Sequence, residues 1–142
     1  MGPHPPEVPV VAAVVERDGA FLVALRPEGK RHGGRWEFPG GKRLRGEDDR
    51  EALRRELQEE LRVEVLEVGR LLHTVRDPET PFVVRFVEAV VRGRPQALEH
   101  EAVRGCRPSA LSELPLAPAA RDFVESALSE GPRPRISSDE SP

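Results

Sequence analysis

Apolar and polar residues follow one another along this chain in blocks that separate strands from helices. Residues 8–16 and 20–25 are apolar and rich in β-branched side chains, which is typical of strands, and Asp18-Gly19 between them is a hairpin-turn signal. Residues 63–75 are expected to form a strand with an irregular middle, and residues 82–92, rich in Val and Phe, a central strand. Shorter strands are predicted at 36–38 and 103–107, with loops at 26–35 and 42–47.

Helical spacing appears in the middle of the chain. Asp48 followed three residues later by Glu51 is a capping signal, and it predicts a helix that starts just after Asp48. Four apolar residues recur at helical spacing and would form the buried stripe of this helix: Ala52, Leu53, Leu57 and Leu61. A helical turn is predicted at 109–113 and a second helix from 118 to about 128. Interleaved helices and strands predict an α/β fold.

The two ends of the chain differ in composition from its middle. With 142 residues, a single domain is expected. We place this domain at residues 8–130, after a proline-containing N-terminus at 1–7 that we expect to be flexible. Residues 131–142 combine Pro, Ser and charge, which is typical of a disordered tail.

Charge and cysteine content exclude several functional classes. The net charge is −3, with 22 basic and 25 acidic residues well mixed, so no basic field predicts binding to duplex nucleic acid. Cys106 is the only cysteine, which excludes a disulfide within the chain and a multi-cysteine zinc site. No apolar run is long enough to span a membrane, and no secretory signal is recognisable. We expect a cytoplasmic protein, monomeric or homodimeric.

Three carboxylates fall on one face of the predicted helix. Glu56, Glu59 and Glu60 are spaced i, i+3 and i+4, which places Cβ atoms about 5–6 Å apart. Like charges repel, so the fold gains nothing from this grouping unless a cation binds there. Mg²⁺ takes oxygen ligands together with water and substrate phosphates, and the pattern therefore predicts a metal-phosphate site. The alternative, a solvated Glu/Arg helix face, does not explain the glycines and the glutamate that precede the helix.

These residues and their neighbours resemble the Nudix box, G-x5-E-x7-R-E-U-x-E-E-x-G-U, in which U is a bulky aliphatic residue. Residues 36–42, W-E-F-P-G-G-K, resemble the segment that leads into the box in the MutT-like branch. Arg62 departs from the box, because it stands where the pattern has glycine. The positions that match the box at the required spacings are Gly41, Glu47, Arg55, Glu56, Leu57, Glu59, Glu60 and Val63.

The resemblance implies both a fold and an activity. The fold would be a Nudix-type α/β/α sandwich around a mixed β-sheet. The activity would be Mg²⁺-dependent hydrolysis of a phosphoanhydride, with Mn²⁺ as the alternative ion. A nucleoside or deoxynucleoside triphosphate, standard or oxidised, would yield the monophosphate and pyrophosphate. The alternatives are a nucleotide-sugar or dinucleoside polyphosphate hydrolase, and a non-catalytic module that binds a nucleotide.

The resemblance also assigns roles to single residues of the box. Glu56, Glu59 and Glu60 would be metal ligands, with the Gly40 carbonyl as a further ligand and Glu59 as an alternative base. Arg55 would orient these carboxylates and offset their repulsion. Glu47 would support the site through hydrogen bonds rather than bind the metal.

Residues outside the helix would bind the substrate. Arg26 and Lys42 are candidates for the triphosphate, and solvated side chains are the alternative. Glu37 is expected beside the base-binding cleft, and Gly41 lets the backbone approach the ion. Glu99 is the candidate base, on a charged loop. For its neighbour His100 we expect a surface or supporting role, and for Arg85, in mid-strand, an acidic partner or a cleft position. Pro118 stands where MutT-type proteins present an asparagine to oxidised guanine, which weakens an expectation of 8-oxo-dGTP.

Overall fold

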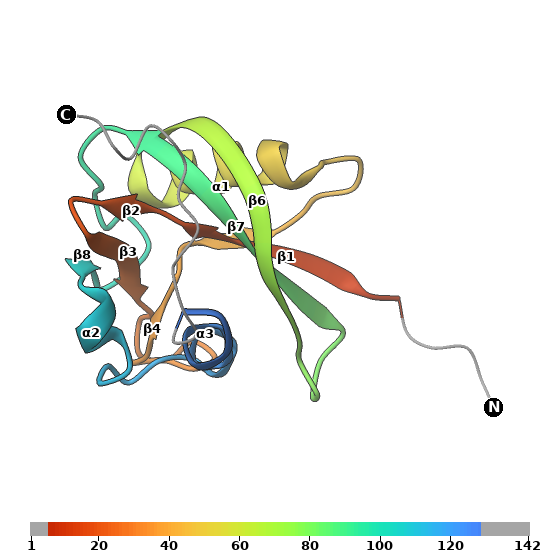
Figure 1. Ribbon diagram of the computed structural model, residues 1–142. Coiled ribbons are helices and arrows are strands. Elements are labelled where there is room, and N and C mark those ends of the chain that lie inside the picture. Colours follow the sequence, from red (N-terminus) through yellow and green to blue (C-terminus); the bar gives the residue numbers. More distant parts are fainter. Residues whose placement is uncertain (1–5, 129–142) are drawn as a thin grey trace.

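Two four-stranded sheets form the centre of the computed structural model, which describes residues 6–128 (Figure 1). In the first sheet the strand order is β5-β1-β7-β6, with β1 and β7 parallel and the other pairs antiparallel. This sheet is therefore mixed. Its strands are β1 (Val8–Val14), β5 (Gly40–Lys42), β6 (Glu64–Arg76) and β7 (Phe82–Arg92). The second sheet is antiparallel and contains β2 (Glu16–Arg17), β3 (Ala20–Leu25), β4 (Trp36–Glu37) and β8 (Ala102–Cys106).

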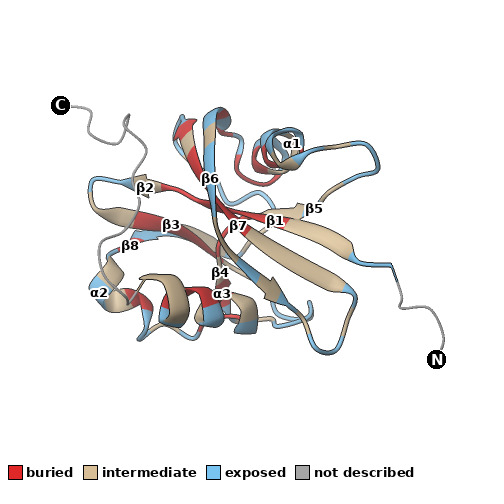
Figure 2. Cartoon of the chain, turned by 45° about the vertical axis from the view of Figure 1, so that its right-hand side comes forward, coloured by how far each residue is buried: buried red, intermediate tan, exposed pale blue. Residues whose placement is uncertain are grey.

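Helices cover both faces of the first sheet, and buried residues lie along the strands between them (Figure 2). Helix α1 (Asp49–Leu61) packs its predicted apolar stripe against Val11 and Val87 on one face. Successive side chains of a strand point to opposite faces, so the neighbouring Phe86 packs on the other side. There it stacks on Phe123 of α3 (Pro118–Phe123), with ring centroids 4.5 Å apart. The short helix α2 (Pro108–Leu111) also packs on this side.

Local hydrogen bonds and backbone conformation end helix α1 at both of its termini. Asp48 and Glu51 form the predicted capping box, in which each side chain accepts a hydrogen bond from the other residue's backbone N–H. At the other end Arg62 has φ 57° and ψ 40°, and its N–H donates to the Gln58 carbonyl. This is the left-handed conformation that glycine normally supplies. Arg62 therefore ends the helix in the way the box glycine would, with added backbone strain.

The structure corrects the predicted elements at two places. The loop predicted over 42–47 begins one residue later, because Gly40–Lys42 pair with β1 as strand β5. The predicted helix at 118–128 is α-helical only to Phe123 and continues as a π-helix, Val124–Leu128. The irregular middle of β6 is confirmed by register shifts between Val65 and His73. Residues 1–5 and the predicted disordered tail lie outside the described residues. No helix within residues 6–128 is long and apolar enough to cross a membrane.

Candidate active site

A cavity of about 480 Å³ lies between the first sheet, the segment after β3 and the start of α3. Most of the candidate residues outside α1 line this cavity, whereas a second cavity, of about 200 Å³, has no acidic residue in its lining. Of the four box glutamates, Glu47, Glu56, Glu59 and Glu60, only Glu60 lines the larger cavity. The structure thus brings together Arg26, Glu37, Gly40, Gly41, Lys42, Glu60, Glu99, His100 and Pro118.

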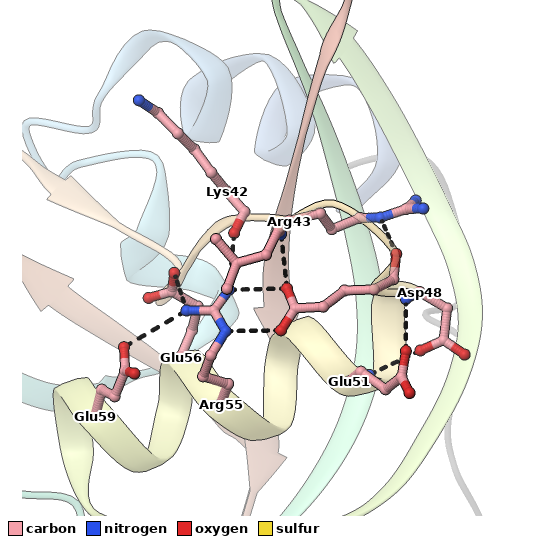
Figure 3. A network of polar contacts seen from close by, with 9 residues as sticks. Lys42, Arg43, Asp48, Glu51, Arg55, Glu56 and Glu59 are labelled. Atoms are coloured by element: carbon pink, nitrogen blue, oxygen red, sulfur yellow. Dashed lines mark hydrogen bonds and ion pairs between the residues drawn. The ribbon is translucent and has the colours of Figure 1, made fainter.

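Arg55 is the centre of the polar network beside this cavity (Figure 3). Its guanidinium donates to both carboxylate oxygens of Glu47, at 2.7 and 2.9 Å, and to Glu56 Oε2 at 3.0 Å. It also donates to the Lys42 carbonyl and forms an ion pair with Glu59 at 3.5 Å. One guanidinium therefore connects three carboxylates from two segments, which holds them close despite their repulsion.

Glu47 belongs to this network but not to the cavity lining. The hydrogen bonds that it accepts from Arg55 and from the Leu44 N–H lower the pKa of Glu47 to about 2. The same pairing raises the pKa of Arg55 above its ordinary value. Glu47 is consequently a permanent anion whose two oxygens are already used, as the supporting role requires.

Glu60 has the opposite environment. Its side chain is buried, and Oε1 has no hydrogen-bond partner. Burial raises the pKa of Glu60 to about 9, and Glu56, Glu37 and Glu99 contribute to the same shift. A buried oxygen without a partner is destabilising unless a ligand completes it.

The backbone of Gly40-Gly41 closes this part of the site. A Cβ atom at Gly41 would lie 2.4 Å from the Glu56 carboxylate, and one at Gly40 would lie 1.9 Å from the Val11 carbonyl oxygen. Gly40 also has φ +156°. A side chain at Gly40 would force β5 away from β1, and one at Gly41 would displace the Glu56 carboxylate of α1.

This donor set fits a hard divalent cation. Carboxylate and carbonyl oxygens are the ligands that Mg²⁺ prefers, and the unpartnered Glu60 oxygen lies in the lining of the cavity. Within residues 6–128, however, no three acidic, His or Cys side chains are already arranged as a metal cluster. Arg55 now binds Glu56 and Glu59, and the side chain of Glu59 is 54% exposed. An ion bound by all three glutamates would compete with Arg55 for Glu56 and Glu59, whereas Glu56 already contacts Glu60.

Glu37, which also lines the cavity, is held between two side chains. Its carboxylate accepts hydrogen bonds from Arg26 Nη1, at 3.1 and 3.3 Å, and faces His100 Nε2 at 2.9 Å. The His100 side chain is only 6% exposed. Of the two roles expected for His100, the surface role does not fit, because the side chain is a buried partner of Glu37.

Cationic and apolar groups complete the cavity wall. Lys42 Nζ lies 4.9 Å from the centroid of the Phe82 ring, and both residues line the cavity. Phe82, Val84 and Phe86 alternate along β7 and line the cavity from the same side, a period-two pattern that is visible in the sequence. Arg85, on the opposite face, has the acidic partner that we expected: it donates to Asp49 at 2.8 Å.

The NUDIX domain family matches residues 5–127 of this chain. Among proteins of known function, the CTP pyrophosphohydrolase of Escherichia coli strain K12 is 38% identical over 124 residues, which cover 85% of this chain and 91% of the relative. The 8-oxo-dGTP diphosphatase of Proteus vulgaris is 42% identical over 67 residues, 46% of this chain and 59% of that protein.

Solved structures show the same architecture. The solution structure of the E. coli ORF135 protein superimposes with a TM-score of 0.75 at 37% identity, and covers 88% of this chain and 92% of its own. The MutT NUDIX hydrolase from Burkholderia pseudomallei gives a TM-score of 0.74 at 28% identity, over 84% of this chain and 96% of that one. The similarity extends over nearly all of the described residues.

Proposed function

The chain belongs to the Nudix hydrolase family, and we propose that it hydrolyses a nucleoside or deoxynucleoside triphosphate to the monophosphate and pyrophosphate in the presence of Mg²⁺. The observation that supports this most is that one cavity lining combines two kinds of groups. The buried Glu60, beside the box carboxylates, suits a cation and phosphates. Glu37 and an apolar wall suit a planar base that carries N–H donors.

The proposed reaction needs a nucleophile, charge neutralisation and a proton acceptor. Water attacks a phosphorus atom, a new P–O bond forms, and the anhydride P–O bond to the pyrophosphate leaving group breaks. The proton of the attacking water passes to a carboxylate, for which Glu99 is the first candidate and Glu59 the second. A divalent cation held by Glu56, Glu59, Glu60 and the Gly40 carbonyl would neutralise phosphate oxygens and polarise the water.

Other residues position the substrate and the ligands in this proposal. Arg55 orients the carboxylates through the hydrogen bonds already described, and Lys42 brings an ammonium group to the cavity for the phosphates. Arg26 is bound to Glu37, so we assign its charge chiefly to holding that carboxylate. Mn²⁺ would suit the same oxygen ligands.

A panel of nucleoside triphosphates with Mg²⁺ tests this function. Glu60→Gln should lower kcat/KM for the best substrate by about a hundredfold or more, because the change removes a buried ligand charge at the reacting end. The matched control is Glu67→Gln, at an exposed position of β6 outside the cavity lining, which should leave activity within about twofold.

Two results would contradict the proposal. Folded protein that turns over no triphosphate would exclude the activity, and nucleotide binding without turnover would favour a binding module. Turnover of nucleotide sugars or dinucleoside polyphosphates in preference to triphosphates would move the substrate to the alternative class.

A further inference from the structure

We propose that His100 is a positioning residue in the cavity wall: it ties the loop carrying Glu99 to the Glu37 carboxylate. This inference rests on the proposed function, and it adds a residue to which the Nudix box assigns no role. It predicts that a nucleobase bound at Glu37 and the base that activates water are held by one shared contact.

The loop over residues 96–101, between β7 and β8, crosses from α1 to the second sheet. Backbone hydrogen bonds of 2.9–3.1 Å attach it at both ends, while Glu99 and His100 lie between the attached positions. The bonds run from Gln96 N to Leu61 O, from Leu98 N to Glu60 O, and from Glu101 N to Leu25 O. The loop therefore bridges the end of the metal-binding helix and the end of β3.

His100 supplies the side-chain anchor of this bridge. Among the side chains of residues 96–101, all of which the structure describes, only that of His100 forms a hydrogen bond. The bond joins Nε2 to Glu37 Oε2 at 2.9 Å, and a carboxylate can only accept, so Nε2 carries the hydrogen. The ring is buried, and Nδ1 has no partner. This single contact fixes the ring relative to β4.

Glu37 is itself fixed from the opposite side. Arg26 contacts both of its oxygens, and Arg26, Glu37 and His100 all line the cavity. Loss of His100 would leave the carboxylate attached to Arg26 alone. It would also leave the side chains of the 96–101 loop without a hydrogen-bonded anchor.

The two carboxylates that His100 connects share one cavity with Glu60. Glu37, Glu60 and Glu99 all belong to its lining. Leu98, next to Glu99, is bonded directly to the Glu60 carbonyl. A displaced loop would move Glu99 relative to the reacting phosphate, and a general base contributes about 10²–10⁴-fold only when it is correctly placed. His100 should therefore act on kcat more than on KM.

A double-mutant cycle tests this role with the triphosphate that wild-type protein hydrolyses fastest. We expect His100→Leu to lower kcat about 30-fold with KM changed by less than about threefold, and Glu99→Gln to lower kcat about a hundredfold. The double variant should match Glu99→Gln, because a loop without its base has nothing left to position. His100→Gln offers an N–H donor at a similar reach and should restore most of the lost kcat.

The control is His73→Leu, which removes another histidine–carboxylate pair, with Asp122 at 2.8 Å, outside the cavity lining. It should leave kcat within about threefold. If the wild-type protein is active and the His100 and Glu99 substitutions lower kcat additively, the positioning role is wrong while the proposed function stands. No turnover by the wild-type protein would overturn the proposed function and this role with it. If His100→Leu does not fold, His100→Gln decides: kcat within about threefold of wild type supports the role, and a loss as large as that of Glu99→Gln contradicts it.

Discussion

The ionised form of Glu60 is disfavoured when no cation is bound, because its carboxylate is buried away from water. Its pKa is raised to about 9 by burial first and by neighbouring carboxylates second, against an ordinary value of 4.5. Below pH 4.5 both the folded and the unfolded chain hold this proton. Between pH 4.5 and 9 only the folded chain holds it, so the free energy of unfolding falls as pH rises through this window. Glu47 has the opposite shift, and its contribution is lost only as pH falls below 4.5 toward 2.

We therefore predict that the stability of the protein depends on pH and that Glu60 causes this dependence. In the presence of a chelator, the thermal unfolding midpoint should fall from pH 5 to pH 9 more steeply in wild type than in Glu60→Gln. Mg²⁺ should stabilise the wild type more at pH 9 than at pH 6, because at low pH the ion must displace a proton. Equal slopes in the two proteins, measured by circular dichroism, would contradict the assignment.

The single residues differ in how far the sequence could predict them. The box spacing identified Glu56, Glu59 and Glu60 because their grouping follows from helical geometry alone. The sequence could not decide between a surface and a supporting role for His100, because its partner, Glu37, lies 63 positions away and no local pattern links them. The roles assigned to the site residues stay predictions until variants are measured.

At the scale of elements, local chemistry predicted α1 well and β5 poorly. The capping box and the apolar stripe of α1 involve residues three or four positions apart, and both were predicted correctly. Strand β5 contains two adjacent glycines, which is typical of a turn, and it is a strand only because Gly41 pairs with Val11 of β1. The π-helix that follows α3 had no signal in the sequence.

Arg62 gives the prediction that belongs to this scale. Arg62→Gly should raise the free energy of unfolding by roughly 0.5–1 kcal/mol, because glycine adopts φ 57° without the Cβ strain. Activity should stay within about twofold, since the left-handed helix end is already formed. Urea denaturation of wild type, Arg62→Gly and Arg62→Ala tests this, and the alanine variant, which keeps its Cβ, should show no comparable gain. A loss of stability in the glycine variant would contradict it.

At the scale of the whole molecule, the helices on the two faces of the mixed sheet carry different parts of the site. Helix α1 supplies the carboxylates from one face, and the start of α3 closes the cavity from the other (Figure 2). The α/β/α arrangement around a mixed sheet was predicted from the family resemblance and is confirmed.

The substrate could not be predicted to the same depth. The cavity wall combines residues from 26–32, 75–86 and 117–120, so its shape depends on how distant segments pack. Pro118, Ala119 and Ala120 offer no side-chain hydrogen bond to a base, so a base would depend on polar residues from other segments of the lining, such as Glu37 and His100. The domain bounds of 8–130 also stay a prediction.

The products formed from a triphosphate test the central claim most directly. Phosphorus NMR of the reaction with Mg²⁺ should show nucleoside monophosphate and pyrophosphate appearing in equal amounts, with no signal growth when Mg²⁺ is chelated. Release of orthophosphate and nucleoside diphosphate, or hydrolysis at the same rate without a divalent cation, would contradict the metal-dependent pyrophosphohydrolase that the cavity and the box carboxylates support.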